Sequence, residues 1–183
     1  MRDVRGDVVR RQLKADHGVD VTRVRSICGY LIHGQTEQEA IAQRVDDLFA
    51  DPIIEQGATN TILLSTDMFD GTPDAVITVG FKPGVTDNPG KAATDGFLTL
   101  FPHDREAKIA TYLTYAFYGL PSDCDVAWLA GTLHNNLIER ALTADRDACQ
   151  AREWPEISFP TPPEQVFIEP QSVDLEVEDS ALE

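Results

Sequence analysis

AVITVGFKPGVTDNPG, residues 75–90, combines three local structure signals in one stretch. Residues 75–81 are small, apolar or β-branched, which predicts a buried strand. Pro83-Gly84 then predicts a tight turn, and Gly90 opens a segment with helical periodicity. The last four residues, Asp87-Asn88-Pro89-Gly90, have a counterpart in Asp3-Val4-Arg5-Gly6, at an offset of 84 (90 − 6). The Asp-x-x-Gly helix start therefore recurs at the beginning of the chain.

The correspondence continues along most of the chain. Residues 24–34 align with residues 109–119 after one residue of slippage, and residues 51–55 align with residues 135–139 at the original offset of 84 (139 − 55). A period of this length is too long for a solenoid repeat and has the size of a small domain. The sequence therefore predicts two copies of one fold, side by side, as in a dimer.

Periodicity predicts similar elements in the two copies. The first copy is expected to contain a helix after Gly6, with Val9 and Leu13 on one face, and then a hairpin of strands 19–27 and 30–32. A helix over 36–49, which opens with a Thr36-x-x-Glu39 capping box, and a closing strand over 59–65 are expected to follow. The second copy is expected to contain the strand 75–81 and a helix with an apolar face of Ala93, Phe97, Leu100 and Phe101. A strand or tight hairpin over 109–118 is expected next. The last expected element is a helix capped by Ser122, with an apolar face of Val126, Leu129, Ala130 and Leu133.

Each copy thus approximates the order β-α-β-β-α-β. That order is typical of a ferredoxin-like fold, in which helices cover one face of an antiparallel sheet. The expected class is α+β, with a first repeat over residues 1–66 and a second over residues 74–145. The first copy begins at its Asp-x-x-Gly turn, so its first strand is absent. Because that strand is central in such a sheet, we expect the reading frame to extend upstream.

Residues 146–183 have the composition of an extended, acidic linker. From Ala151 onward there are nine acidic residues and one basic residue, and prolines stand at 155, 160, 162, 163 and 170. Such a segment offers little apolar surface to bury.

Charge and cysteine content narrow the class of partner. The net charge is −16, which argues against nucleic acid and anionic membranes as partners. Cys28, Cys124 and Cys149 are odd in number and widely spaced, which favours reduced thiols in a cytoplasmic protein. No apolar run approaches the roughly 18 residues that span a bilayer.

Several residues invite a chemical interpretation, and each has a structural one. Residues 84–91 approach a P-loop, but five residues separate the glycines and Ala92 stands where the hydroxyl is needed, so a plain turn is expected. Cys28 and His33 would make a thiolate–imidazole pair, but nothing nearby orients it, and a small buried thiol is expected instead.

The remaining histidines and aromatic residues receive structural interpretations too. His17, His103 and His134 are scattered and show no zinc-ligand spacing. His134-Asn135-Asn136 is expected to cap a helix end. The aromatic side chains of one strand region are expected to pack rather than to stack on a ligand: Tyr112, Tyr115, Phe117 and Tyr118. No catalytic, cofactor-binding or metal-binding residue is therefore predicted.

Lys82-Pro83-Gly84-Val85-Thr86-Asp87-x-x-Gly90, between a strand and a helix, resembles the opening of the small PurS-type module of phosphoribosylformylglycinamidine synthase (FGAM synthase). Residues 24–32 and 51–55 resemble the remainder of that module. The long, PurL-type single-chain form of the enzyme begins with a region similar to two fused PurS-like halves, followed by a linker. The resemblance covers nearly all of residues 2–183, and residues 173–183 resemble the entry to the linker.

The resemblance implies a structural role in purine biosynthesis. The whole enzyme is a ligase that amidates formylglycinamide ribonucleotide with ATP, Mg²⁺ and glutamine, and those sites lie in later domains. The PurS-like region is expected to bridge the synthetase and glutaminase parts, with no cofactor of its own. A homodimer is a further expected association, through an open sheet edge.

Two alternatives stay open from the sequence. One is a stand-alone ferredoxin-like module that regulates by binding a small metabolite between its sheets. The other is an independent enzyme that uses Cys28 or His134.

Overall fold

The computed structural model describes residues 3–50, 57, 59 and 71–161, which form an α+β fold. One antiparallel sheet of four strands packs against helices, in the order β1-β3-β2-β4. The strands are β1 (Arg23–His33), β2 (Ala75–Phe81), β3 (Lys108–Tyr118) and β4 (Glu139–Ala144). The prediction of two ferredoxin-like repeats, each with its own sheet, is therefore wrong: the described strands share one sheet.

The two strands that correspond in sequence, β1 and β3, pair with each other. They run antiparallel over their whole length, from Arg23 opposite Tyr118 to His33 opposite Lys108. The predicted hairpin of 19–27 and 30–32 is wrong, because the chain stays extended through Gly29. A Cβ at Gly29 would overlap the ring of Tyr112, which lies against it from β3. This glycine thus permits close packing and does not make a turn.

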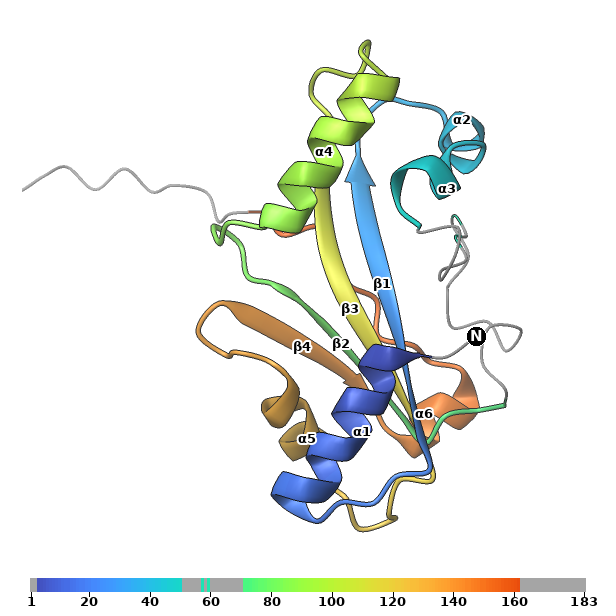
Figure 1. Ribbon diagram of the computed structural model, residues 1–183, viewed down its shortest axis with the longest axis vertical. Coiled ribbons are helices and arrows are strands. Elements are labelled where there is room, and N and C mark those ends of the chain that lie inside the picture. Colours follow the sequence, from blue (N-terminus) through green and yellow to red (C-terminus); the bar gives the residue numbers. More distant parts are fainter. Residues whose placement is uncertain (1–2, 51–56, 58, 60–70, 162–183) are drawn as a thin grey trace, which may run out of the picture.

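Helices cover both faces of the sheet (Figure 1). On one face, which we call the front, lie α1 (Val4–His17), α4 (Asn88–Leu100) and α5 (Val126–Leu133). The short helix α6 (Arg146–Ala151) packs on the back, and α2 (Gln38–Ala42) and α3 (Val45–Leu48) lie beside β1. None of the helices in the described ranges is both long and apolar enough to cross a bilayer.

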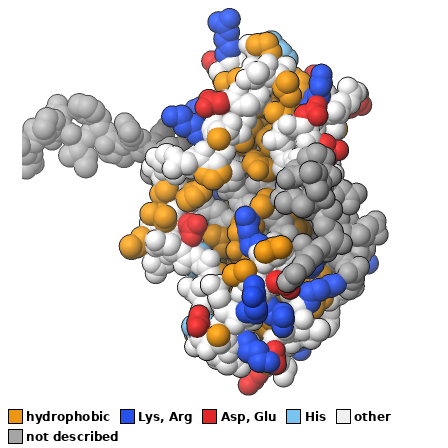
Figure 2. Space-filling model, in the orientation of Figure 1, with side chains coloured by type: hydrophobic (Ala, Val, Ile, Leu, Met, Phe, Trp, Pro, Cys, Tyr) orange, Lys and Arg blue, Asp and Glu red, His pale blue; other side chains and the backbone are white. Residues whose placement is uncertain are grey.

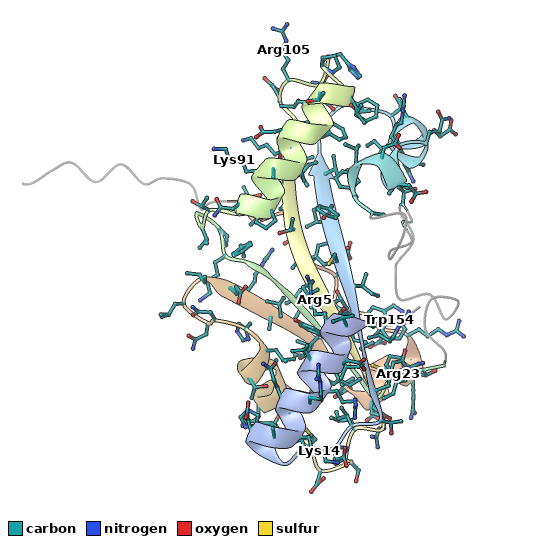
Figure 3. The ribbon with its side chains drawn as sticks, viewed as in Figure 1. Arg5, Lys14, Arg23, Lys91, Arg105 and Trp154 are labelled. Atoms are coloured by element: carbon teal, nitrogen blue, oxygen red, sulfur yellow. The ribbon has the colours of Figure 1, made fainter. Side chains whose placement is uncertain are left out.

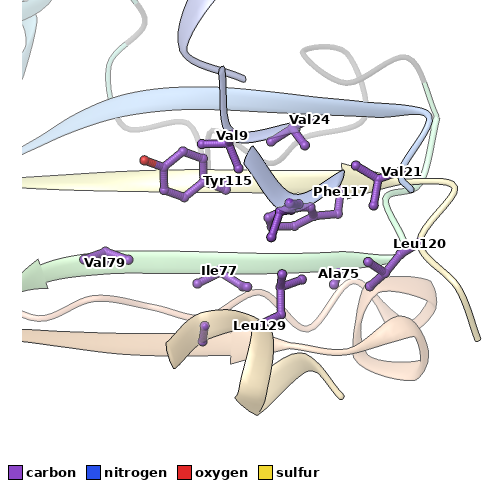
Figure 4. Close-up of a cluster of buried hydrophobic side chains, with 12 residues drawn as sticks. Val9, Val21, Val24, Ala75, Ile77, Val79, Tyr115, Phe117, Leu120 and Leu129 are labelled. Carbon is purple, nitrogen blue, oxygen red and sulfur yellow. The ribbon is translucent and has the colours of Figure 1, made fainter. Parts of the chain in front are cut away.

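The main core lies between the front helices and the sheet (Figure 4). Helix α1 contributes Val9 and Leu13 to this core, and α5 contributes Leu129. They pack on Ile77 of β2 and Phe117 of β3, and Leu129, Ile77 and Phe117 are fully buried. The predicted apolar faces of these two helices are thus confirmed. Side chains alternate along a strand, so every second residue of β2 and β3 faces this core.

A second cluster holds α4 against the upper part of the sheet. Phe97 is completely buried and lies 4.8 Å, ring to ring, from Phe101. Both pack on Ile109, as the periodicity predicts. Leu100 was expected on the same face but is 39% exposed, because the helix ends there and Phe101 turns inward as its C-cap.

The back of the sheet is covered by the segment that follows β4. Cys149 of α6 packs on Val76 and Ala116, and Trp154 lies against the same cluster (Figure 3). Ile157 is 9% exposed and fills the space beside Gly80. Residues 146–161, which composition assigns to the linker, therefore contribute apolar side chains to the fold, and residues 162–183 lie outside the described residues.

Two of the predicted helix starts are wrong. The predicted helix over 36–49 is two short helices, and the Thr36 hydroxyl donates to Asp104, at 2.7 Å, instead of capping. Helix α5 is capped by Asp125, which accepts from the amide of Ala127, and not by Ser122. The predicted closing strand over 59–65 lies outside the described residues, apart from Thr59.

The Asp-x-x-Gly stretches have the same geometry at both helix starts. Asp87 accepts the Gly90 amide at 2.7 Å, and its carboxylate also accepts the Thr111 amide of β3. Asp3 accepts the Gly6 amide at 2.7 Å and the Ser26 amide of β1. Each aspartate therefore caps a helix and fastens it to the strand that follows in the chain.

Because Asp87 bonds to both a helix and a strand, removing it should lower the unfolding free energy more than removing Asp125, which caps only its own helix. Asp87→Ala leaves both a helix amide and a strand amide without an acceptor, so we expect a loss of roughly 2–4 kcal/mol in unfolding free energy. Asp125→Ala, at an exposed cap that serves only its own helix, should cost about 1 kcal/mol or less. Urea unfolding of both variants measures the difference, and equal losses would contradict the bridging role.

Candidate functional site

Near the middle of the front face, where α1 and α4 begin, polar side chains come together. Helices α1 and α4 both begin near the middle of the sheet and run in opposite directions (Figure 1). Arg5, in the first turn of α1, lies over this region (Figure 3), and its guanidinium Nη1 is 3.1 Å from Cys28 Sγ. Tyr115 lies below and is 7% exposed. Burial raises the pKa of this phenol, and the nearby Arg5 lowers it by a smaller amount.

Cys28 and His33 do not form a catalytic pair. Both lie on β1, five residues apart, so their side chains point to opposite faces at a separation of about 16 Å along the strand. The prediction that Cys28 is buried is also wrong, because the diverging helices leave it exposed. His33 lies on the back, with its ring 5.9 Å from that of Phe159.

The turn that resembles a P-loop is an ordinary strand-to-helix connection. Gly84 has a positive φ of 83°, which favours glycine, and the chain then enters α4. The carboxylate of Asp87 occupies the helix N-terminus, where a P-loop would hold phosphate. Lys91 is exposed and points away from the sheet (Figure 3). The expectation of a plain turn is confirmed.

The other predicted site residues have structural roles as well. His134 is the C-cap of α5, and its Nδ1 lies 2.6 Å from the Ala130 carbonyl oxygen, as the capping interpretation predicts. His17 packs edge-on against Trp128 at 5.2 Å. His103 lies 6.2 Å, ring to ring, from Phe101. Within the described part of the chain, no group of histidine, cysteine and acidic side chains is placed to hold a metal ion.

The aromatic residues of β3 pack, as expected. Tyr115 and Phe117 belong to the main core. On the back, the ring of Tyr112 lies against Gly29, and Arg23 stacks on Tyr118 with its guanidinium carbon 4.4 Å from the ring centre. Burial raises the pKa of Tyr112. None of these rings lines either of the two hollows beside α1.

Sequence reasoning missed Asp104, which joins the two halves of the chain. This carboxylate is 2% exposed, and its Oδ2 accepts from the amides of Gln35 and Thr36 and from the Thr36 hydroxyl, each at 2.7 Å. The Thr36 hydroxyl is the main cause that lowers the pKa of Asp104, with smaller effects from the two amides and His103, while desolvation opposes them. No local pattern marks this residue, because its partners lie 68 and 69 positions away.

Two hollows on the described surface are small and shallow. The larger, of about 230 Å³, lies on the outer flank of α1, beside Val8, Gln12 and Ala15. The other, of about 190 Å³, lies between α1 and α5. Pockets for drug-sized ligands usually start near 300 Å³ and are concave and mostly apolar.

Exposed apolar side chains lie at one edge of the front face, where the turn after β2 meets the loop between α5 and β4 (Figure 2). The amide of Lys82 donates to the Ile138 carbonyl oxygen at 2.9 Å, and its Nζ donates to the Asn136 carbonyl oxygen. This bonds the Lys-Pro-Gly turn to the loop between α5 and β4. Leu137 is 80% exposed there and Ile138 41%. We call residues 137–138 the loop patch.

The polar groups described above make contacts within the fold. In the described residues, Cys28 has an arginine beside it and no general base, and the buried acid Asp104 is used to hold a turn. The exposed apolar side chains of the loop patch are the kind of surface that partner proteins cover.

Asp104 predicts a pH dependence of stability. Its folded pKa lies below the ordinary value of 3.8, so its stabilising effect is complete above that pH and is lost as the pH falls below it. Asp104→Asn should be less stable than the parent near pH 7, and the gap should shrink below about pH 4. Urea midpoints measured across this range test the effect; a gap that stays constant with pH would contradict it.

The three thiols should react in order of their exposure. Cys28 is exposed and should be alkylated first by iodoacetamide. Burial, with help from Asp145 and Asp74, raises the pKa of Cys149 to about 11, so this thiol should react only after unfolding. Peptide mass spectrometry gives the order, and Cys28→Ser is the control that should remove the fast phase. Early labelling of Cys149 would contradict the described packing.

Comparison with known proteins adds no assignment. No protein-family model, no curated protein and no solved structure matches this chain. The likeness to the PurS-type module therefore rests on the residues quoted from the sequence.

Proposed function

We propose that this chain is a non-catalytic assembly region of phosphoribosylformylglycinamidine synthase. In that role it bridges the synthetase and glutaminase parts of an enzyme that uses ATP, Mg²⁺ and glutamine to amidate formylglycinamide ribonucleotide. The region has a structural task only, and the chemistry belongs to its partners.

The observation that carries this proposal is the stretch from Lys82 to Gly90. Three residues of that stretch have a specific use here: Gly84 adopts a positive φ, Asp87 caps α4, and Gly90 lets the helix lie close to the Ile109 carbonyl oxygen of β3. A sequence match in which these three residues are used by the local geometry is stronger support than a match of composition alone.

The surface supports a bridging role in two further ways. In the described residues, Cys28 and His33 lie on opposite faces of β1, and no group of histidine, cysteine and acidic side chains is placed to hold a metal ion. The loop patch, which adjoins the Lys82 turn, presents Leu137 at 80% exposure. An apolar side chain in this position is suited to being buried by a neighbouring domain.

Reconstitution with the synthetase and glutaminase parts from the same source tests the proposal. The chain should form a complex with them, detectable by light scattering after size exclusion. Amidation driven by glutamine should require the chain, whereas amidation driven by added ammonium should not, because only the former needs the two active sites joined. Failure to bind either part at tens of micromolar would overturn the assignment.

A point substitution makes the same test specific to the surface. Leu137→Asp places a charge at the loop patch and should weaken complex formation roughly ten-fold or more, since losing one buried apolar anchor costs at least about 1.4 kcal/mol. Its melting temperature should stay unchanged because the side chain is exposed. Gln150→Asp, at an exposed position of α6 behind the sheet, is the matched control and should bind normally.

A further inference from the structure

Helix α1 carries an apolar row on the side that faces away from the sheet. Val9 and Leu13 point into the core, but Val4 is 64% exposed and Val8 is 38% exposed. Ala15 is exposed too, and at 100° per residue it falls on the same side as the two valines. A hollow of about 230 Å³ lies along this row, beside Val8 and Ala15. The helix thus presents apolar side chains on two sides, and the sheet covers one of them.

A basic row, Arg10, Arg11 and Lys14, runs beside the apolar one. Helix α1 has four basic and two acidic residues, a net charge of +2 (4 − 2), and Figure 2 shows basic side chains gathered over the part of the front face where it lies. Lys14 is paired with Asp20 at 2.7 Å. Among the described residues, no carboxylate lies within ion-pair distance of Arg10 or Arg11. This row therefore attracts acidic segments, although the whole chain has a net charge of −16.

The sequence after Thr161 has the complementary pattern. Residues 162–183 contain seven acidic residues and no basic one. Within this segment, Val173-Asp174-Leu175-Glu176-Val177-Glu178 alternates apolar and acidic residues at every position. An extended chain places alternate side chains on opposite sides, so these six residues can present one apolar side and one acidic side.

We propose that residues 173–178 bind along α1 of the same chain, with their apolar side against the apolar row and their acidic side against the basic row. The lengths agree, because α1 rises about 17 Å from Val4 to Ala15 (11 × 1.5 Å) and six extended residues span about 17 Å (5 × 3.3 Å). The spacing agrees as well: Val4 and Val8 are about 6 Å apart along the helix axis, and alternate residues of an extended segment are about 6.6 Å apart. This proposal is independent of the proposed function.

The connection from the fold to this segment is long enough to reach the helix. Val173 lies twelve residues after Thr161, and twelve residues can span about 40 Å at about 3.3 Å each. A folded domain of about 160 residues has a radius of gyration near 15 Å, so this length reaches across it. A tether of this kind also gives a local concentration on the order of millimolar. At micromolar protein, the segment of the same chain is therefore favoured over that of a second copy.

A synthetic copy of residues 171–180, labelled with fluorescein, measures whether the surface is occupied. In a full-length chain that carries Val173→Ser, Leu175→Ser and Val177→Ser, the two rows should be free and should bind the peptide. The parent chain should bind it at least about ten-fold more weakly, because its own segment competes for the same surface. Raising the salt concentration to about 0.5 M should weaken binding to the serine variant, since the basic row is exposed.

Charge reversal shows where the peptide binds. Added to the serine variant, Arg11→Glu should weaken peptide binding roughly ten-fold, which corresponds to about 1.4 kcal/mol. Lys91→Glu makes the same change at an exposed position of α4 and is the matched control, which should bind the peptide normally. Equal weakening by the two substitutions, or no binding to the serine variant at about 1 mM peptide, would overturn the proposed surface.

Amide NMR spectra of the full-length chains give a second measure. The serine variant should differ from the parent mainly in the amides of α1 and little in those of α4. Equal peptide binding by parent and serine variant, or unchanged α1 amides, would overturn the proposed occupant and leave the surface to an acidic segment of another protein. A parent dimer in light scattering that the serine variant does not form would place the segment on a second copy and overturn binding within one chain.

Discussion

A carboxylate that bonds to a helix and a strand at once is the contact on which this fold depends. A helix N-terminus exposes amides without acceptors, and an aspartate normally satisfies them locally. Here Asp3 and Asp87 also accept the amide of a residue on the following strand, together with its hydroxyl, from Ser26 and Thr111 respectively. The helix axis is thereby fixed against the sheet before any apolar side chain is considered.

The close approach of helix to strand explains the glycine in each Asp-x-x-Gly stretch. A Cβ at Gly6 or Gly90 would overlap the carbonyl oxygen of Val24 or Ile109. The aspartate draws the helix end toward the strand, and the glycine leaves room for it. Helix α1 is fastened to β1 and α4 to β3, and these two strands pair with each other. A small displacement of one helix start would therefore be transmitted through the paired strands to the other helix.

The parts of the fold that depend on local patterns were predictable. The apolar face of α1, the buried strand β2 and the start of α4 follow from spacing and from residue types within one element. What failed depended on residues distant in sequence. Gly29 predicts a turn from its local sequence, but its actual role is to leave room for the ring of Tyr112 on the neighbouring strand. Thr36 suggests a helix cap until Asp104, 68 positions away, is found to accept its hydroxyl.

The boundary between core and linker was hidden by composition for a similar reason. Prolines and acidic residues dominate the sequence after Ala151, but two apolar side chains in it, Trp154 and Ile157, reach the back of the sheet. An average over a window discounts such isolated anchors. A single buried residue of this size contributes about 2–3 kcal/mol, which is enough to hold a short extended segment against a preformed surface.

For the candidate site, the sequence was reliable where a residue's role depends on spacing within one element. Cys28 and His33 are separated by the pleat of a strand, and His134 caps a helix; both alternation and capping are readable from spacing. The exposure of Cys28 was not readable, because it follows from the opposite directions of α1 and α4, which tertiary packing decides. The directions of the two helices are in turn set by Asp3 and Asp87, so the exposure of this thiol depends on contacts between elements and not on the residues beside it in the sequence.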